Sequence, residues 1–280
     1  MIFRNFSAWV LGAFVLCGFV ACGGGGGGNS AGGGSIPVTP VPTMVLPGIY
    51  SAQVNGQEFW GVITPASWGS RWYGLHYAAA NPDIYSGDLS GVGTASASAA
   101  SLKYYQNTAA SVLSGTATMK SPGASQLSGD MNLVTLTPPY KQALAFSATT
   151  PASLNYNQAA QWGDIANKWT GTLSYGLGSN TAFDFNVAAP TGAQTTGTVP
   201  GAFGVDCQWT AANSKIESSP EANMFKISLT LSISTACDFK GQTLTGIAFV
   251  QKSPVAGKSQ RLIWVATTLD GKGISFKADR

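Results

Sequence analysis

Hydrophobic and polar residues alternate along much of this chain, with a repeat of two residues. The clearest segment runs from Phe225 to Ile233, where apolar side chains occupy every second position and the residues between them are Lys, Ser and Thr. Successive side chains of a β-strand point to opposite faces, so this segment predicts a strand with one buried and one wet face. Such a division is typical of an antiparallel sheet.

Other short alternating segments indicate that strands make up most of the chain. The Asn55-Gly56 step between two of them favours a tight hairpin, because both residues tolerate the positive φ that a type I′ turn requires. The strands expected in the first half are 48–54, 58–65, 71–80, 86–97, 102–106, 111–120 and 126–136. Those expected in the second half are 168–173, 183–187, 203–209, 225–233, 244–250, 261–267 and 273–278.

The segment 150–169 has no strand pattern and contains the one stretch that favours a helical turn, so we interpret it as a connector. Short spacing between successive strands favours up-and-down connections, and closure of the sheet removes exposed edges. We therefore expect an all-β fold, an antiparallel up-and-down β-barrel or sandwich, with β-halves at 47–160 and 161–280. The pattern leaves open whether the halves share one barrel or form two domains.

The N-terminus has the features of a secretory signal peptide. Arg4 precedes an apolar run that ends at Ala21 and is too short to remain as a membrane-spanning helix. Residues 19–22, Phe-Val-Ala-Cys, resemble the lipobox of bacterial lipoproteins. The resemblance implies a signal peptide at 1–21, acylation of Cys22, palmitate included, and export to the outer membrane because Gly23 follows. The alternative is an ordinary cleaved signal in which Cys22 is incidental.

Residues 22–46 are expected to form a tether. Six glycines follow Cys22 directly, and a Pro-rich stretch leads on toward the first strand. Gly-rich chains are flexible and Pro-rich chains are stiffer spacers, so about 24 such residues spread over roughly 25 to 30 Å. A tether favours the lipoprotein interpretation, because a lipid-anchored body must be held clear of the headgroups. Several acyl chains, at about 0.8 kcal/mol per buried methylene, anchor such a protein stably.

Two of the four cysteines, Cys207 and Cys237, remain once the signal and the lipidated residue are set aside. In an oxidising compartment we expect them to form a disulfide. A closed loop of about 30 residues gives roughly 3.6 kcal/mol of stabilisation in the chain-entropy treatment. The competing interpretation is a metal site, but a metal requires more ligands than two cysteines and the chain has one histidine.

Several short motifs resemble those of betaproteobacterial outer-membrane lipoproteins of unknown function. The matching elements are Cys22 and the glycines after it, Gly48-Ile49-Tyr50, Tyr73-Gly74-Leu75, Trp169-Thr170-Gly171, Cys207, Asn223 to Leu229, Cys237, Thr245 to Ala248, Arg261-Leu262 and Gly273 to Phe276. The resemblance spans most of the chain. It implies a β-barrel or β-sandwich in the cell envelope, and it assigns no active site.

Composition and motifs argue against several kinds of chemistry. The formal net charge is +3 and charged residues make up 10% of the chain, which argues against nucleic-acid binding. No serine elbow or phosphate-binding loop occurs in a convincing context. His76 lies in an aromatic strand and is expected to be structural, and the acidic residues fall mostly in loops. We expect no enzyme activity, no cofactor and no metal.

Aromatic residues are the remaining candidates for a site. Trp60, Trp68, Trp72 and Tyr73 are close in sequence and could line a ligand pocket. The alternative is that they fill a barrel interior, since small barrels need large inward side chains.

These sequence features favour two functions. The first is a lipid-anchored, non-catalytic binding module for a small molecule, a glycan or a protein at the outer membrane, with the membrane bound through covalent lipid. The second is a structural or assembly lipoprotein that acts through protein contacts. A cavity of about 300 Å³ or more favours the first. A filled interior with an exposed apolar patch favours the second.

Overall fold

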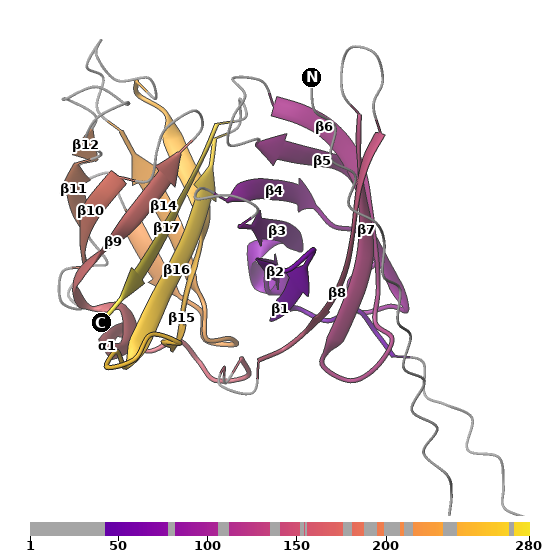
Figure 1. Cartoon of the computed structure of the whole chain (residues 1–280), viewed down its shortest axis with the longest axis horizontal. Coiled ribbons are helices and arrows are strands. Elements are labelled where there is room, and N and C mark those ends of the chain that lie inside the picture. Colours follow the sequence, from indigo (N-terminus) through magenta and orange to yellow (C-terminus); the bar gives the residue numbers. More distant parts are fainter. Residues whose placement is uncertain are drawn as a thin grey trace, which may run out of the picture. The chain divides into compact units, whose positions relative to one another are not determined.

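The computed structural model confirms the all-β antiparallel fold (Figure 1). It describes residues 43–77, 82–105, 112–134, 141–151, 154, 156–175, 181–187, 195–198, 208–209, 215–231, 240–268 and 272–280. Residues Pro42–Arg280 form one compact unit that contains a closed eight-stranded barrel and a nine-stranded sheet. Within the described residues, no helix has both the length and the apolar character needed to cross a bilayer.

The barrel contains the first eight strands in sequential order, each antiparallel to the next, as expected for up-and-down connections. The ring closes where Ser51 pairs with Thr149. Its strands are β1 (Gly48–Val54), β2 (Gln57–Ile63), β3 (Arg71–His76), β4 (Asp83–Asp88), β5 (Ser96–Tyr105), β6 (Val112–Lys120), β7 (Gln126–Val134) and β8 (Lys141–Thr149); a short 3-10 helix, η1 (Ala66–Trp68), precedes β3.

Two features of the barrel differ from the predicted strands. The alternation did not predict β8, and two predicted segments, 86–97 and 102–106, divide instead into β4 and one longer β5. The register between β5 and β6 shifts between Ala99 and Leu102, which breaks the alternation there. Small Ser and Ala side chains carry little hydrophobic contrast, so pairing with neighbouring strands decides these boundaries.

The second sheet has the strand order β12-β11-β10-β9-β17-β16-β15-β14-β13. The chain enters it through α1 (Trp162–Ile165), the single helical turn expected in the connector. Its strands are β9 (Asn167–Tyr175), β10 (Thr181–Val187), β11 (Thr195–Thr198), β12 (Gln208–Trp209), β13 (Lys215–Ser218), β14 (Phe225–Thr230), β15 (Thr243–Lys252), β16 (Gln260–Thr267) and β17 (Gly273–Asp279). The expected alternation of β14 is observed, since Phe225, Ile227 and Leu229 are fully buried.

Aromatic side chains pack together in the barrel core. Trp72 and Phe59 both approach Phe146, with ring centroids 5.5 and 4.9 Å away, and Tyr85 stacks on Tyr104 at 4.8 Å. All five side chains belong to one buried cluster. Large inward side chains of this kind fill the interior of a small barrel.

A separate apolar cluster joins the outer face of the barrel to one face of the second sheet. Val62 and Tyr73 of the barrel share it with Phe249, Ile263 and Val265 of the sheet. As a result β2 and β16 are buried along both faces for most of their length. The expectation of one buried and one wet face is therefore wrong for β15 and β16, because the barrel covers the face that would otherwise meet water.

The two ends of the β1–β2 hairpin have different surroundings. At its turn, Asn55 and Gly56 have φ values of 52° and 75°, as the hairpin prediction requires. At the opposite end of β1, Val45 is fully buried in the barrel core. Its N–H donates to the Thr94 carbonyl, and its own carbonyl accepts from the Gly93 N–H, at 2.7 Å each. The chain thus enters the barrel at the end remote from this turn.

Candidate functional site

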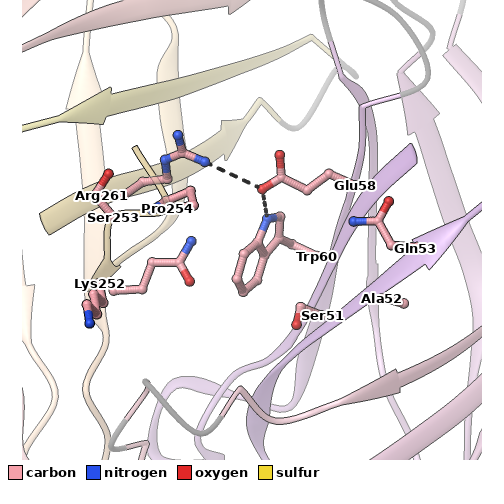
Figure 2. A pocket seen from close by; sticks show the side chains of 10 residues that line it. Ser51, Ala52, Gln53, Glu58, Trp60, Lys252, Ser253, Pro254 and Arg261 are labelled. Atoms are coloured by element: carbon pink, nitrogen blue, oxygen red, sulfur yellow. Dashed lines mark hydrogen bonds and ion pairs between the residues drawn. The ribbon is translucent and has the colours of Figure 1, made fainter. Parts of the chain in front are cut away.

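A cavity of about 670 Å³ lies between the barrel and the second sheet (Figure 2). One wall comes from the β1–β2 hairpin and the other from β15, β16 and the turn that joins them. The lining residues are Ser51, Ala52, Gln53, Glu58, Trp60, Gln251, Lys252, Ser253, Pro254 and Arg261. The volume falls within the range of about 300 to 1,000 Å³ that is typical of small-ligand sites.

Strand register brings the polar lining together. Ser51 lies opposite Trp60 and Gln53 lies opposite Glu58 in the β1–β2 ladder. Across the cavity, Gln251 pairs with Arg261 in the β15–β16 ladder. Residues directly opposite on antiparallel strands project from the same face of the sheet. The first hairpin therefore presents the three polar side chains of Ser51, Gln53 and Glu58 to the cavity, and the second presents the two of Gln251 and Arg261.

The contact between barrel and sheet changes from apolar to polar toward these hairpins. Phe249 packs against Trp60, with ring centroids 5.4 Å apart, and Ile263 belongs to the same buried cluster. Two residues further along each strand, on the same face, stand Gln251 and Arg261. The cavity thus lies where the apolar contact gives way to polar residues, and Ala52, Trp60 and Pro254 are its apolar lining.

Four charged side chains form one network beside the cavity. Arg261 donates from Nε and Nη2 to the two carboxylate oxygens of Asp279, at 2.8 Å each. Glu58 of the barrel accepts a 2.7 Å hydrogen bond from the Trp60 indole N–H. It also pairs with Arg261 at 3.9 Å and with Lys277 at 3.4 Å. Glu58 therefore links the barrel to the second sheet through two cations.

The network shifts the pKa values of its members. Burial alone raises the pKa of Asp279, but hydrogen bonds from Arg261 and Ser253 outweigh it and hold that pKa below its ordinary value. Burial lowers the pKa of Arg261, and its bonds to Asp279 together with the Glu58 charge raise it overall. Burial and the Glu58 charge raise the pKa of Tyr77, whose ring lies 3.9 Å beneath the Lys277 ammonium. Both ions of the Arg261–Asp279 pair thus stay charged at neutral pH.

Other polar side chains of the lining have no hydrogen-bond or ion-pair partner in the described part of the chain, and we call them uncommitted. They are the side chains of Ser51, Gln53, Gln251 and Lys252. Gln251 is only 9% exposed and lines the cavity. Its amide has no protein partner among the described residues, so it hydrogen-bonds to water or to a molecule that enters the cavity. Its position therefore favours a polar molecule in the cavity.

The four predicted aromatic residues do not form one site. Trp60 lines the cavity, whereas Trp72 is fully buried inside the barrel. Tyr73 lies in the apolar contact between the halves, and Trp68 packs against that same cluster from η1. The period of two explains the division, because adjacent residues of β3 point to opposite faces.

The other predicted residues fall in two groups. His76 is buried, with Nε2 3.4 Å from the Val54 carbonyl oxygen and its ring 6.3 Å from that of Phe59, which is a structural environment. Cys22, Cys207 and Cys237 lie outside the described residues, so lipidation and the disulfide stay predictions. Among the residues that the structure describes, no three His, Cys, Asp or Glu side chains are grouped as a metal site would need.

The sequence did not single out Glu58, Gln251 and Arg261 as site residues; Glu58 and Arg261 stand on strands that it predicts, and Gln251 directly follows the predicted strand 244–250. Each is a polar residue two positions from an apolar residue on the same face of its strand, namely Trp60, Phe249 and Ile263 in turn. That pattern marks where an apolar interface ends. It can be recognised only when β2 of the barrel is known to face β15 and β16 of the second sheet.

No family model matches the chain, and neither a curated protein nor a solved structure is significantly similar to it. The interpretation of the cavity therefore depends on its own geometry.

Proposed function

We propose that this protein is a lipid-anchored, non-catalytic binding protein of the bacterial cell envelope that holds a small polar ligand between its barrel and its second sheet. The observation that carries the proposal is the cavity of about 670 Å³ with the buried, uncommitted amide of Gln251 in its wall. Ligand sites combine apolar surface with fixed polar groups, and here Trp60, Ala52 and Pro254 supply the apolar surface while the other lining residues are polar.

The walls of the cavity are held in place without a ligand. The apolar cluster between barrel and sheet lies beneath it, and the Glu58 ion pairs to Arg261 and Lys277 join the two walls beside it. A site whose side chains are already ordered loses less conformational entropy when it binds. This preorganisation supports a binding role.

The place where the chain enters the barrel also supports the proposal. Residues 43–46 meet the barrel at the start of β1, whereas the cavity is lined by the half of the β1–β2 hairpin nearest its turn. A tether that runs from an acylated Cys22 would therefore join the barrel at the end away from the cavity. Such a tether leaves the site accessible to ligands.

The alternative, an assembly lipoprotein that acts through protein contacts, would be favoured by an exposed apolar patch. In the described part of the chain, the exposed large hydrophobic side chains are Met44, Leu46 and Val255. Scattered residues of this kind are normal on a soluble surface. The cavity therefore favours ligand binding.

The anchor is tested with the full-length protein and its Cys22→Ala variant, expressed in Gram-negative cells with labelled palmitate. We expect label and membrane association in the wild type and neither in the variant. Proteinase K treatment of intact cells then reports which face of the outer membrane holds the protein. Membrane association that survives Cys22→Ala would contradict the lipoprotein part of the proposal.

The binding role is tested by thermal melting of the full-length protein against chemically distinct small molecules, with Ser51→Phe as a variant that narrows the cavity. A ligand of the cavity raises the Tm of the wild type by mass action and leaves that of Ser51→Phe unchanged. Equal shifts in both proteins for every active compound would contradict binding at this site.

A further inference from the structure

Apart from Lys252, which is exposed to solvent, the charged side chains at the cavity are paired with one another or with their neighbours. Arg261 makes a bidentate pair with Asp279, and Glu58 is bound by Trp60, Arg261 and Lys277. A ligand with a strong charge would have to compete with one of these internal pairs. The paired network therefore favours a ligand with no net charge in contact with it.

The uncommitted groups of the lining both donate and accept hydrogen bonds. The amides of Gln53 and Gln251 each offer an N–H₂ and a carbonyl oxygen, and the Ser51 hydroxyl offers both functions in one group. A hydroxyl group of a ligand likewise donates and accepts. Several such groups on one molecule match this arrangement better than carbonyls or amines alone, which supply one function each.

Trp60 adds a fixed aromatic surface to the same cavity. Its indole N–H is held by Glu58 at 2.7 Å, and Phe249 packs against it from the apolar side. Figure 2 shows the ring between the wall that carries Arg261 and Ser253 and the hairpin that carries Ser51. The C–H faces of a sugar ring are slightly positive and are attracted to the negative face of an aromatic ring.

From these three observations we propose that the cavity binds a neutral saccharide, either free or as the end of a glycan, through Gln251, Gln53 and Ser51 with the ring of Trp60 beneath it. This inference rests on the proposed binding function and specifies the ligand class. Lys252, exposed at the rim, extends the polar contact toward solvent.

The test is calorimetric titration of the acylated full-length protein in a polyoxyethylene detergent, which has no sugar headgroup. The titrants are neutral mono- and disaccharides, the same sugars with a carboxylate, zwitterionic amino acids, and a neutral polysaccharide. The variants are Gln251→Ala and, as a matched control, Gln126→Ala, an exposed glutamine at the start of β7 on the barrel. Circular dichroism melts establish that each variant is folded.

We expect a neutral saccharide to bind the wild type, Gln251→Ala to bind it about tenfold more weakly because a buried hydrogen bond is lost, and Gln126→Ala to bind it unchanged. Binding of the polysaccharide but not of free sugars would assign the glycan end as the source. If amino acids or acidic sugars bind with the same dependence on Gln251 and neutral saccharides do not, the saccharide inference fails and the binding function stands. If no titrant shows affinity that depends on Gln251, both are overturned.

Discussion

Arg261 and Asp279 lie directly opposite each other on β16 and β17, and the guanidinium forms two 2.8 Å hydrogen bonds with the carboxylate. The pair stands at the edge of the apolar contact between barrel and sheet. Glu58 of the barrel approaches the same guanidinium at 3.9 Å. One arginine therefore takes part both in the sheet and in the contact between the two halves.

Removal of one partner from this pair is expected to destabilise the fold strongly. Asp279→Ala leaves the Arg261 side chain, which is 10% exposed, without its bidentate partner, and we expect a loss of about 3 kcal/mol in the free energy of unfolding. Urea denaturation followed by circular dichroism measures it. Lys215→Ala, which removes the exposed pair with Glu217, is the control and should cost about 0.5 kcal/mol or less. Equal losses in the two variants would show that the buried pair stabilises the fold no more than the exposed pair does.

The same pair predicts how stability depends on pH. The pKa of Asp279 is lower in the folded protein than its ordinary value of 3.8, so its contribution is complete above that pH and is lost as the pH falls through the folded pKa. Asp279→Asn should be less stable than the wild type at neutral pH, and the difference should shrink in acid. Urea titrations at several pH values between neutrality and strong acid measure it; a difference that stays constant with pH would contradict the assignment.

Gly61 has no room for a side chain inside the barrel. A Cβ at this position would meet the Trp72 ring, 2.8 Å from its Cζ3 atom. Gly61→Ala is therefore expected to cost about 1 to 3 kcal/mol through overpacking. The cost should fall when Trp72→Leu is introduced first, which a double-mutant cycle detects. Gly163→Ala, where a Cβ meets no atom within 4 Å, should be neutral or slightly stabilising.

The chain just before β1 is expected to be part of the folded body. Val45 is fully buried, so Val45→Ala should lower the free energy of unfolding by about 2 kcal/mol. Met44 precedes it and is 49% exposed, so Met44→Ala should change stability by about 0.5 kcal/mol or less. Thermal melts of both variants compare the two positions. Equal shifts would contradict the closure of this barrel end by Val45.

The disulfide prediction has a direct chemical test. Mass spectrometry of the mature protein, digested without reduction, should yield a peptide pair that joins Cys207 to Cys237. Reduction should then lower the free energy of unfolding by roughly 3.6 kcal/mol or less, the chain-entropy value for a loop of about 30 residues. Two free thiols on protein taken from an oxidising compartment would contradict the prediction.

Local pattern predicted individual strands well where the hydrophobic contrast was high. The Asn55-Gly56 hairpin and the alternation of β14 follow from turn chemistry and a period of two, which neighbouring residues alone determine. β8 was missed, and the boundary between β4 and β5 was misplaced. In β5 the small residues give little signal, and pairing with neighbouring strands sets the boundaries.

The candidate site could not be found in the same way. Sequence proximity grouped Trp60 with Trp68, Trp72 and Tyr73, yet Trp72 points into the barrel and Trp60 into the cavity. Two residues of the same site, Gln251 and Arg261, come from β15 and β16, about two hundred positions further along the chain. No local rule relates positions so far apart.

The sequence by itself therefore determined the all-β class, the up-and-down order and the hairpin turn, because each depends on alternation and turn residues within a few positions. Only the tertiary structure decided that the outer face of the barrel packs against the second sheet. That contact buries β15 and β16 on both faces, pairs Glu58 with Arg261, and leaves a cavity where the apolar contact ends. The physical reason is that burial and charge pairing across two sheets depend on which faces meet, and spacing along the chain does not specify this.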